Sequence, residues 1–231
     1  MPHLLSNAPD VVHPESGGRP GFVISGLAGA CEVRYAFADY EEQQGAVSFA
    51  FEGEEAPLSG CYRELCALAT GLTASTQVVT ARGVLRADEI VRGDLVLTRS
   101  NGMQPVKWVG HRHLDWKILG LIPALRPKQI PAGRLVAGLP DKPVELMQHQ
   151  RYATGGSDVV SLMESKTEIE FEPVSAPCCH LVQLLFEGVQ FIHCDGLWLE
   201  SFRPTHLNTG LLAEDDRIEI MMIQQSSRVV S

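Results

Sequence analysis

Sulfur and imidazole side chains are grouped in two short segments near the end of the chain, Cys178-Cys179-His180 and His193-Cys194. Thiolates and imidazoles are common protein ligands of Zn²⁺. Their spacing argues against a metal site, because no Cys-x2-Cys pair is present and adjacent residues on a strand point to opposite faces. The two segments should form paired strands of one hairpin. The pattern favours buried structural cysteines, and we expect no metal and no other cofactor.

The remaining signatures of familiar chemistry are missing. The chain has six cysteines in 231 residues, too few and too irregularly spaced for a disulfide scaffold, so reduced thiols are expected. It has no Gly-x-Ser-x-Gly elbow, His-Glu-x-x-His pair, P-loop or dinucleotide fingerprint. The common hydrolase, metalloprotease and nucleotide-binding classes therefore have no support.

Charge and hydropathy narrow the possible partners. The net charge of -9, with no Lys/Arg run, opposes binding to a nucleic-acid backbone. No apolar run approaches the roughly 20 residues of a membrane helix. The first 20 residues lack the pattern of a signal peptide. We expect a cytoplasmic protein that contacts a protein partner or its own flanking chain and binds neither nucleic acid nor membrane. Secretion by a non-standard route, which leaves no recognisable sequence signal, is left open. The oligomeric state is left open.

The elements that could position a site are clearest between Thr76 and Thr98. Gln77 to Ala81 alternates polar and apolar residues, and after a Gly turn Val84 to Arg86 returns, which predicts a hairpin. Ala87 to Ile90 predicts a short turn-like segment, and Asp94 to Thr98 predicts a further strand. The following Asn101-Gly102 pair is a two-residue hairpin signal.

This block resembles the first block of the Hint domain, the fold shared by inteins and the processing domain of hedgehog proteins. The family features are a Thr-rich strand, a Gly turn, an Ile before a Gly-Asp pair, and a strand that ends in Thr. The matching residues are Thr76, Thr80, Gly83, Ile90, Gly93, Asp94 and Thr98. Three later segments, Gln104–Arg112, Ile130–Pro140 and His180–Pro204, are similar to the bacterial Hint subfamily in the same order. Several short motifs in one order are more specific than any single one.

The resemblance implies a mostly β protein, with a pseudo-two-fold all-β Hint-like domain over residues 71–206. We expect a mobile N-terminal segment at residues 1–20 and a small α+β region at residues 21–70. That region should hold strands at Phe22–Ser25, Cys31–Phe37 and Ala46–Glu52 and a helix at Gly60–Ala69. A C-terminal tail at residues 207–231 should contain a helix over Leu212–Gln225, although its sequence also fits a strand.

The same resemblance places the catalytic positions. In the family, a Cys or Ser at the first position attacks the preceding carbonyl. A Thr or Ser and a His three residues later polarise the scissile peptide and protonate its leaving nitrogen. An acidic residue and, in this subfamily, a His two positions later assist the second step. By motif these positions fall on Gly71, Met147, Gln150, Glu187 and Val189.

Of these groups, only the carboxylate remains. Substitute groups would be Ser75 or Thr76 as nucleophile and His149, one residue from Gln150, as proton donor, together with Glu187. A displaced nucleophile would also displace the scissile bond from the site. We therefore expect a degenerate Hint scaffold that has lost self-cleavage and acts as a structural or interaction module. The alternatives are active self-processing with the substitute groups, and a small-molecule binder that uses the vacated cleft.

Overall fold

The computed structural model describes residues 11–12, 21–25, 31–39, 44–51, 58–61, 70–115, 119, 125–135, 138–154, 158–162, 172–173, 178–205, 208–209 and 212–229, and for residues 11–61 it describes the backbone only. The chain forms two compact units, residues 1–68 with 206–213 and residues 69–205 with 214–231. Each unit is described by itself.

The first unit contains a five-stranded antiparallel sheet in which neighbours in sequence are neighbours in space. Its strands are β1 (Val11–Val12), β2 (Gly21–Ser25), β3 (Cys31–Asp39), β4 (Gln44–Phe51) and β5 (Leu58–Cys61). The three strands expected in this region overlap β2, β3 and β4. The expected helix start at Gly60 is wrong, because Gly60 and Cys61 pair with β4. Residues 62–69 lie outside the described residues, as do residues 1–20 apart from β1.

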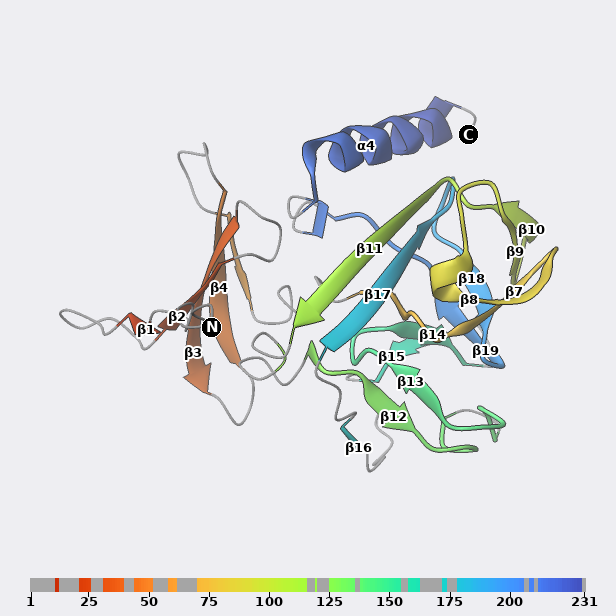
Figure 1. Ribbon diagram of the computed structural model, residues 1–231, viewed down its shortest axis with the longest axis horizontal. Helices are drawn as coiled ribbons and strands as arrows, with labels where there is room; N and C mark the ends of the chain where they lie inside the picture. Colours follow the sequence, from red (N-terminus) through yellow and green to blue (C-terminus); the bar gives the residue numbers. More distant parts are fainter. Residues whose placement is uncertain are drawn as a thin grey trace, which may run out of the picture. The chain divides into compact units, whose positions relative to one another are not determined.

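The second unit is built around an eight-stranded antiparallel sheet (Figure 1). In spatial order its strands are β10 (Gly102–Pro105), β9 (Leu95–Thr98), β7 (Gln77–Thr80), β18 (Phe191–Cys194), β19 (Leu197–Glu200), β14 (Arg151–Ala153) and β15 (Val159–Ser161), with β8 (Gly83–Arg86) paired to β7. The hairpin predicted at residues 77–86 is confirmed. The turn-like segment after it is the 3₁₀ helix η2 (Ala87–Glu89).

Two smaller antiparallel sheets complete the β structure among the described residues of this unit. One has the order β11 (Trp108–Asp115), β17 (Cys178–Leu185) and β6 (Leu72–Thr73), and the other has the order β13 (Val144–Leu146), β12 (Lys128–Ile130) and β16 (Glu172–Pro173). Figure 1 shows β11 and β17 as a long ladder. Because β17 pairs with β11 and β6 whereas β18 lies in the large sheet, the hairpin expected from the two cysteine segments is wrong.

The segment Gln104–Arg112, which is similar to one continuous segment of the bacterial Hint subfamily, belongs to two strands in the structure. The chain leaves β10 after Pro105 and begins β11 at Trp108. Between them Val106 N donates to Asp94 O at 2.9 Å and Lys107 N donates to Leu185 O at 2.8 Å. The chain therefore changes partners from β9 to β17 at this point. The preceding loop also differs, since Gly102, at φ +63°, already pairs with Thr98 and leaves a three-residue connection.

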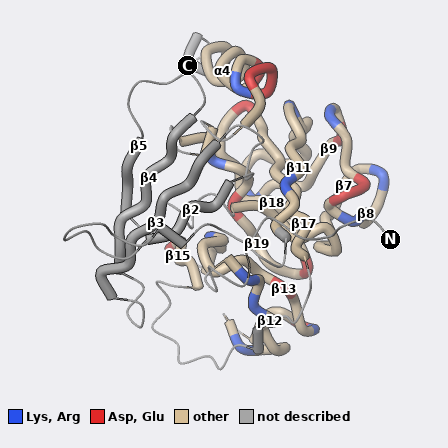
Figure 2. Tube along the Cα trace, turned by 60° about the vertical axis from the view of Figure 1, so that its left-hand side comes forward, with Lys and Arg blue, Asp and Glu red and all other residues tan. Residues whose placement is uncertain are grey.

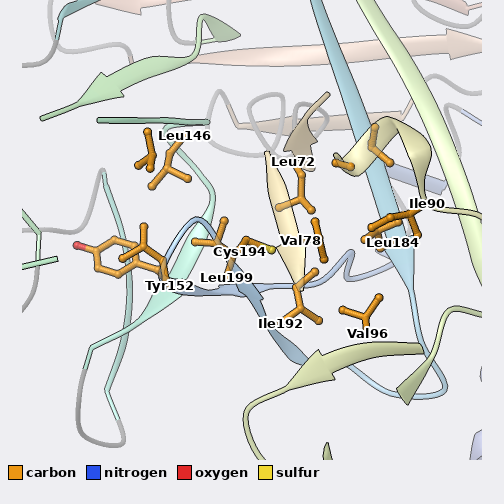
Figure 3. Close-up of a cluster of buried hydrophobic side chains, with 14 of the residues drawn as sticks. Leu72, Val78, Ile90, Val96, Leu146, Tyr152, Leu184, Ile192, Cys194 and Leu199 are labelled. Atoms are coloured by element: carbon orange, nitrogen blue, oxygen red, sulfur yellow. The ribbon is translucent and has the colours of Figure 1, made fainter. Parts of the chain in front are cut away.

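A single hydrophobic cluster joins the large sheet to the β17–β6 pair. Figure 3 shows Val78, Ile192 and Cys194 at its centre, with Leu72 and Leu184 beside them. Val78, Ile192 and Cys194 have no exposed surface. The alternation predicted for residues 77–98 therefore places one face of this hairpin in the core.

The helix expected near the C-terminus is confirmed as α4 (Glu214–Val229). Its acidic first turn suits the positive end of a helix dipole. Asp216 accepts a hydrogen bond from Trp108 Nε1 at 2.9 Å, and Glu219 forms an ion pair with Arg92. Ile220 is buried, whereas Ile218, Met221 and Met222 are exposed. The polar contacts of the first two turns thus attach α4 to β11 and to the turn before β9.

Acidic and basic residues are interspersed along the described chain rather than separated by sign (Figure 2). None of the helices among the described residues is both long and apolar enough to span a bilayer.

Candidate functional site

The peptide bond between Thr70 and Gly71 occupies the position at which the sequence predicted a scissile bond. The following strand β6 pairs with β17, Leu72 opposite Val182 and Thr73 opposite Leu181. Because β17 is itself paired with β11 along its length, the backbone just before β6 is held against a fixed ladder.

Gly71 has a backbone conformation that side-chain-bearing residues rarely adopt. Its φ is +146°. A Cβ atom built on it would lie 3.0 Å from the carbonyl oxygen of Val182 and 3.3 Å from Cγ of Gln183. Both the torsion and the close backbone oxygen disfavour any L side chain. The local structure is therefore built for glycine, and a cysteine or serine would need the strand to shift.

Gln183 holds the peptide that precedes Gly71. Its side-chain Nε2 donates a hydrogen bond to Thr70 O at 3.0 Å, and the residue is only 1% exposed. The sequence reasoning did not single out Gln183. The available signal was one amide inside the apolar run from Leu181 to Phe186, because a buried polar side chain needs a partner.

The two substitute nucleophiles lie in the turn after β6. Ser75 is exposed, and its Oγ lies 3.4 Å from Thr73 Oγ1. Thr76 is buried, and its Oγ1 lies 3.0 Å from the same Thr73 oxygen. The backbone of Thr76 is also fixed, since its N–H donates to Thr73 O and its carbonyl accepts from Ala87 N. These contacts make Thr76 part of a turn that joins β6 to η2.

The positions expected to polarise the scissile peptide lie between β13 and β14. Met147 is 2% exposed and Gln150 is 4% exposed. Gln150 Nε2 donates to Glu200 O at 2.8 Å, so its amide links β14 to the end of β19. His149 is half-buried in the turn formed with Gln148 rather than in a bulged strand. A neutral amide does not deliver the proton that a leaving nitrogen requires, so Gln150 acts here as a structural link.

Glu187 and Val189 are exposed in the connection between β17 and β18. A second carboxylate, that of Asp195, lies in the tight β18–β19 turn, where Asp195 and Gly196 have positive φ. Burial raises the pKa of Asp195, although its Oδ2 accepts from Gln77 N at 3.2 Å and Lys142 lies 3.8 Å from Oδ1. The Asp195 carboxyl therefore links the hairpin turn to β7.

The two buried cysteines, Cys179 and Cys194, do not offer an activated thiolate. Burial raises the pKa of Cys179 to about 12 and raises the pKa of Cys194 well above its usual value. Both thiols are protonated at neutral pH and pack as small apolar groups. Cys178 is exposed, which corrects the expectation of a buried residue there, and all three are reduced.

One groove is formed by α4 and the turn before β9. It is lined by Arg92, Asp215, Ile218, Glu219, Met222, Ile223 and Ser226. None of these residues belongs to the set that the sequence singled out. The groove is therefore separate from the vacated cleft that the binder hypothesis requires.

The chain is similar to known proteins over residues 70–206. The Hint domain family matches residues 70–206, more than half of the chain. A crystal structure of gp41-1 intein is similar with 13% identity and a TM-score of 0.38, over 58% of this chain and 98% of that one. A bacterial intein-like domain from Clostridium thermocellum is similar with 12% identity and a TM-score of 0.40, over 58% of this chain and 99% of that one. No curated protein matches the chain.

Proposed function

Since the chain belongs to the Hint domain family, we propose that it is a degenerate member that keeps the scaffold, no longer cleaves itself, and serves as a structural or interaction module. The observation that carries this proposal is the backbone at Gly71. A positive φ and a carbonyl oxygen 3.0 Å from the absent Cβ leave no room for a nucleophilic side chain without a shift of the strand.

The surrounding contacts support the same proposal. Gln183 and Gln150 use their side-chain amides to link strands, through Thr70 O and Glu200 O. Buried amides that are satisfied by backbone carbonyls stabilise a fixed structure. At two positions where the family carries catalytic residues, Met147 thus serves packing and Gln150 serves hydrogen bonding. The scaffold remains as a β unit that a protein partner or flanking chain could bind.

The proposal is tested by the mass of the intact chain. We incubate the purified protein with and without dithiothreitol and follow it by mass spectrometry. A single unchanged mass in both samples is expected. Thiol-dependent fragments that end near residue 70 would contradict the proposal, because they require an acyl shift at that position. Fragments that end just before Ser75 or Thr76 would instead support self-processing with a substitute hydroxyl.

A variant separates the loss of the nucleophile from the loss of the proton donor. Gly71→Cys restores a thiol, with Gly71→Ala as the matched control for backbone strain. Because Met147 and Gln150 cannot protonate the leaving nitrogen, we expect no thiol-dependent fragments from either variant. If Gly71→Cys gives fragments and Gly71→Ala does not, glycine at residue 71 is the only change that prevents cleavage.

A further inference from the structure

Three histidines share one face of the β11–β17 ladder. His113 pairs directly with His180, and His111 lies two residues from His113 on the same strand. Residues directly opposite each other in an antiparallel ladder, and residues two apart on a strand, lie on the same face. Cys178, two residues before His180, falls on this face as well. His111, His113 and Cys178 are exposed, and His180 is half-buried.

The rings are already in contact. His111 Nδ1 and His180 Nε2 share a hydrogen bond of 3.0 Å, in which one ring nitrogen donates and the other accepts, and a bound ion would take the place of the shared proton. The rings of His113 and His180 stack, with centroids 4.1 Å apart and planes inclined by 20°. Two nitrogens bound to one Zn²⁺ at about 2.1 Å are separated by roughly 3.0–3.4 Å for angles between a right angle and a tetrahedral one. The separation of the His111 and His180 nitrogens therefore fits a shared ion.

We propose that His111, His113 and His180, with Cys178 as a fourth donor, form a surface site for a divalent transition-metal ion such as Zn²⁺. Imidazole and thiolate are the donor types that this class of ion prefers. The site differs from the one rejected on sequence, because it uses residues two apart and a cross-strand partner instead of adjacent residues.

Binding requires a rearrangement of side chains, not of backbone. Among the described residues no group of three or more His, Cys, Asp or Glu side chains is arranged to hold a metal ion as the side chains now lie. His113 must turn from its stack on His180 so that a nitrogen faces the ion. Exposed side chains change rotamer on the picosecond to nanosecond timescale. The paired strands meanwhile keep the four Cα positions fixed.

The experiment is a calorimetric titration of the full chain with ZnCl₂ after treatment with EDTA. We expect one ion per chain, and binding at least about tenfold weaker in His180→Gln and in His111→Gln, since each variant removes one of the two nitrogens already in place. His193→Gln is the matched control, because its ring lies against Trp198 in the large sheet. It should leave the affinity within about twofold.

Cobalt(II) tests the fourth donor. Co²⁺ bound to the wild-type chain should show near-ultraviolet thiolate-to-metal absorption, and Cys178→Ser should abolish it. Circular dichroism without metal checks that each variant is folded. If His180→Gln does not fold, the variants at the two exposed positions, His111 and Cys178, still test the proposal. Failure of the wild type to bind Zn²⁺, or equal affinity in His111→Gln and wild type, would overturn the proposal.

Discussion

Two neighbouring parts of the chain differ in what their residues do: the segment from Thr70 to Thr73 and the block from Thr76 to Thr98. In the block, the motif threonines close turns. Thr80 Oγ1 donates to Gly83 O and accepts from Arg82 N, and Thr98 Oγ1 donates to Gly102 O and accepts from Asn101 N. The motif residues of this block are therefore explained by the stability of the sheet.

The backbone conformation of the segment before β6 depends on the absence of a side chain at residue 71. Gly71 has positive φ, and the carbonyl oxygen of Val182 lies 3.0 Å from the position that a Cβ atom would take. Gln183 donates a hydrogen bond to the preceding carbonyl. The motif residues of the block serve packing and turn geometry whatever reaction the chain performs, so the motif is evidence for the fold and not for self-cleavage.

The largest loss of stability should follow from a substitution in the buried core of the block. Ile90 is 2% exposed and packs in the main hydrophobic cluster. Ile90→Ala should lower the free energy of unfolding by about 2–5 kcal/mol, because it removes buried methyl groups and leaves a cavity. Val84→Ala, at 59% exposure on β8, is the control and should change it by less than about 0.5 kcal/mol. Urea unfolding measures both, and equal losses would show that the block is not packed as described.

The next effect tests the strain at Gly71. Gly71→Ala should lower the free energy of unfolding by about 1–3 kcal/mol, because alanine is disfavoured at φ +146° and its Cβ meets Val182 O. Gly188→Ala should be close to neutral, since a Cβ there has no heavy atom within 4 Å. Equal stabilities of the two variants in urea unfolding would remove the argument that the segment is built for glycine.

Removal of the buried amide should have a slightly smaller effect. Gln183→Leu keeps a similar volume but leaves Thr70 O without its donor, which should cost about 1–2 kcal/mol. Amide hydrogen exchange should also increase in β6, with little change in β9. The exposed Gln129 provides the control through Gln129→Leu. Unchanged exchange in β6 would mean that Gln183 does not hold this segment.

The turn threonines should each contribute less. Thr98→Val and Thr80→Val retain the shape of the side chain and remove two hydrogen bonds at a turn, so each should cost about 1 kcal/mol. Thermal unfolding can rank them against Gly71→Ala. Losses as large as that of Ile90→Ala would assign the threonines a role beyond their turns.

The smallest expected effect is on the stability of the protein at acidic pH. Burial alone would raise the pKa of Asp94, but hydrogen bonds from Arg82 and from Val91 N, with the charge of Arg82, lower it overall. A carboxyl whose pKa is lowered in the folded state stabilises the protein above its unfolded pKa of 3.8, and this contribution is lost as the pH falls through the folded value. In urea unfolding, Asp94→Asn should reduce the dependence of the free energy of unfolding on pH in this acid range.

Asp195 provides the opposite sign. Its pKa is raised in the folded state, so its contribution favours folding at low pH and is lost as the pH rises. Asp195→Asn should therefore keep the loss of stability near pH 3.8. At neutral pH it should raise the free energy of unfolding, because no buried carboxylate has to be charged. Identical pH profiles for the two variants would contradict the assigned directions.

Local patterns predicted much of the second unit. The hairpin of β7 and β8, the strand β9 and the helix α4 follow from alternation, turn residues and periodicity, which act over a few neighbouring residues. The break between β10 and β11 could not be predicted this way, since the partners that divide the strand, Asp94 and Leu185, are distant in sequence.

The sequence by itself determined that the chain is mostly β, that its motifs follow the Hint order, and that no Cys or Ser stands at residue 71, because these depend on residue type and spacing alone. Only the tertiary structure decided that Gly71 lies against Val182 O, that Gln183 reaches Thr70 O, and that three histidines meet on one ladder. These facts depend on strand register, and register is fixed by contacts between residues far apart in the chain.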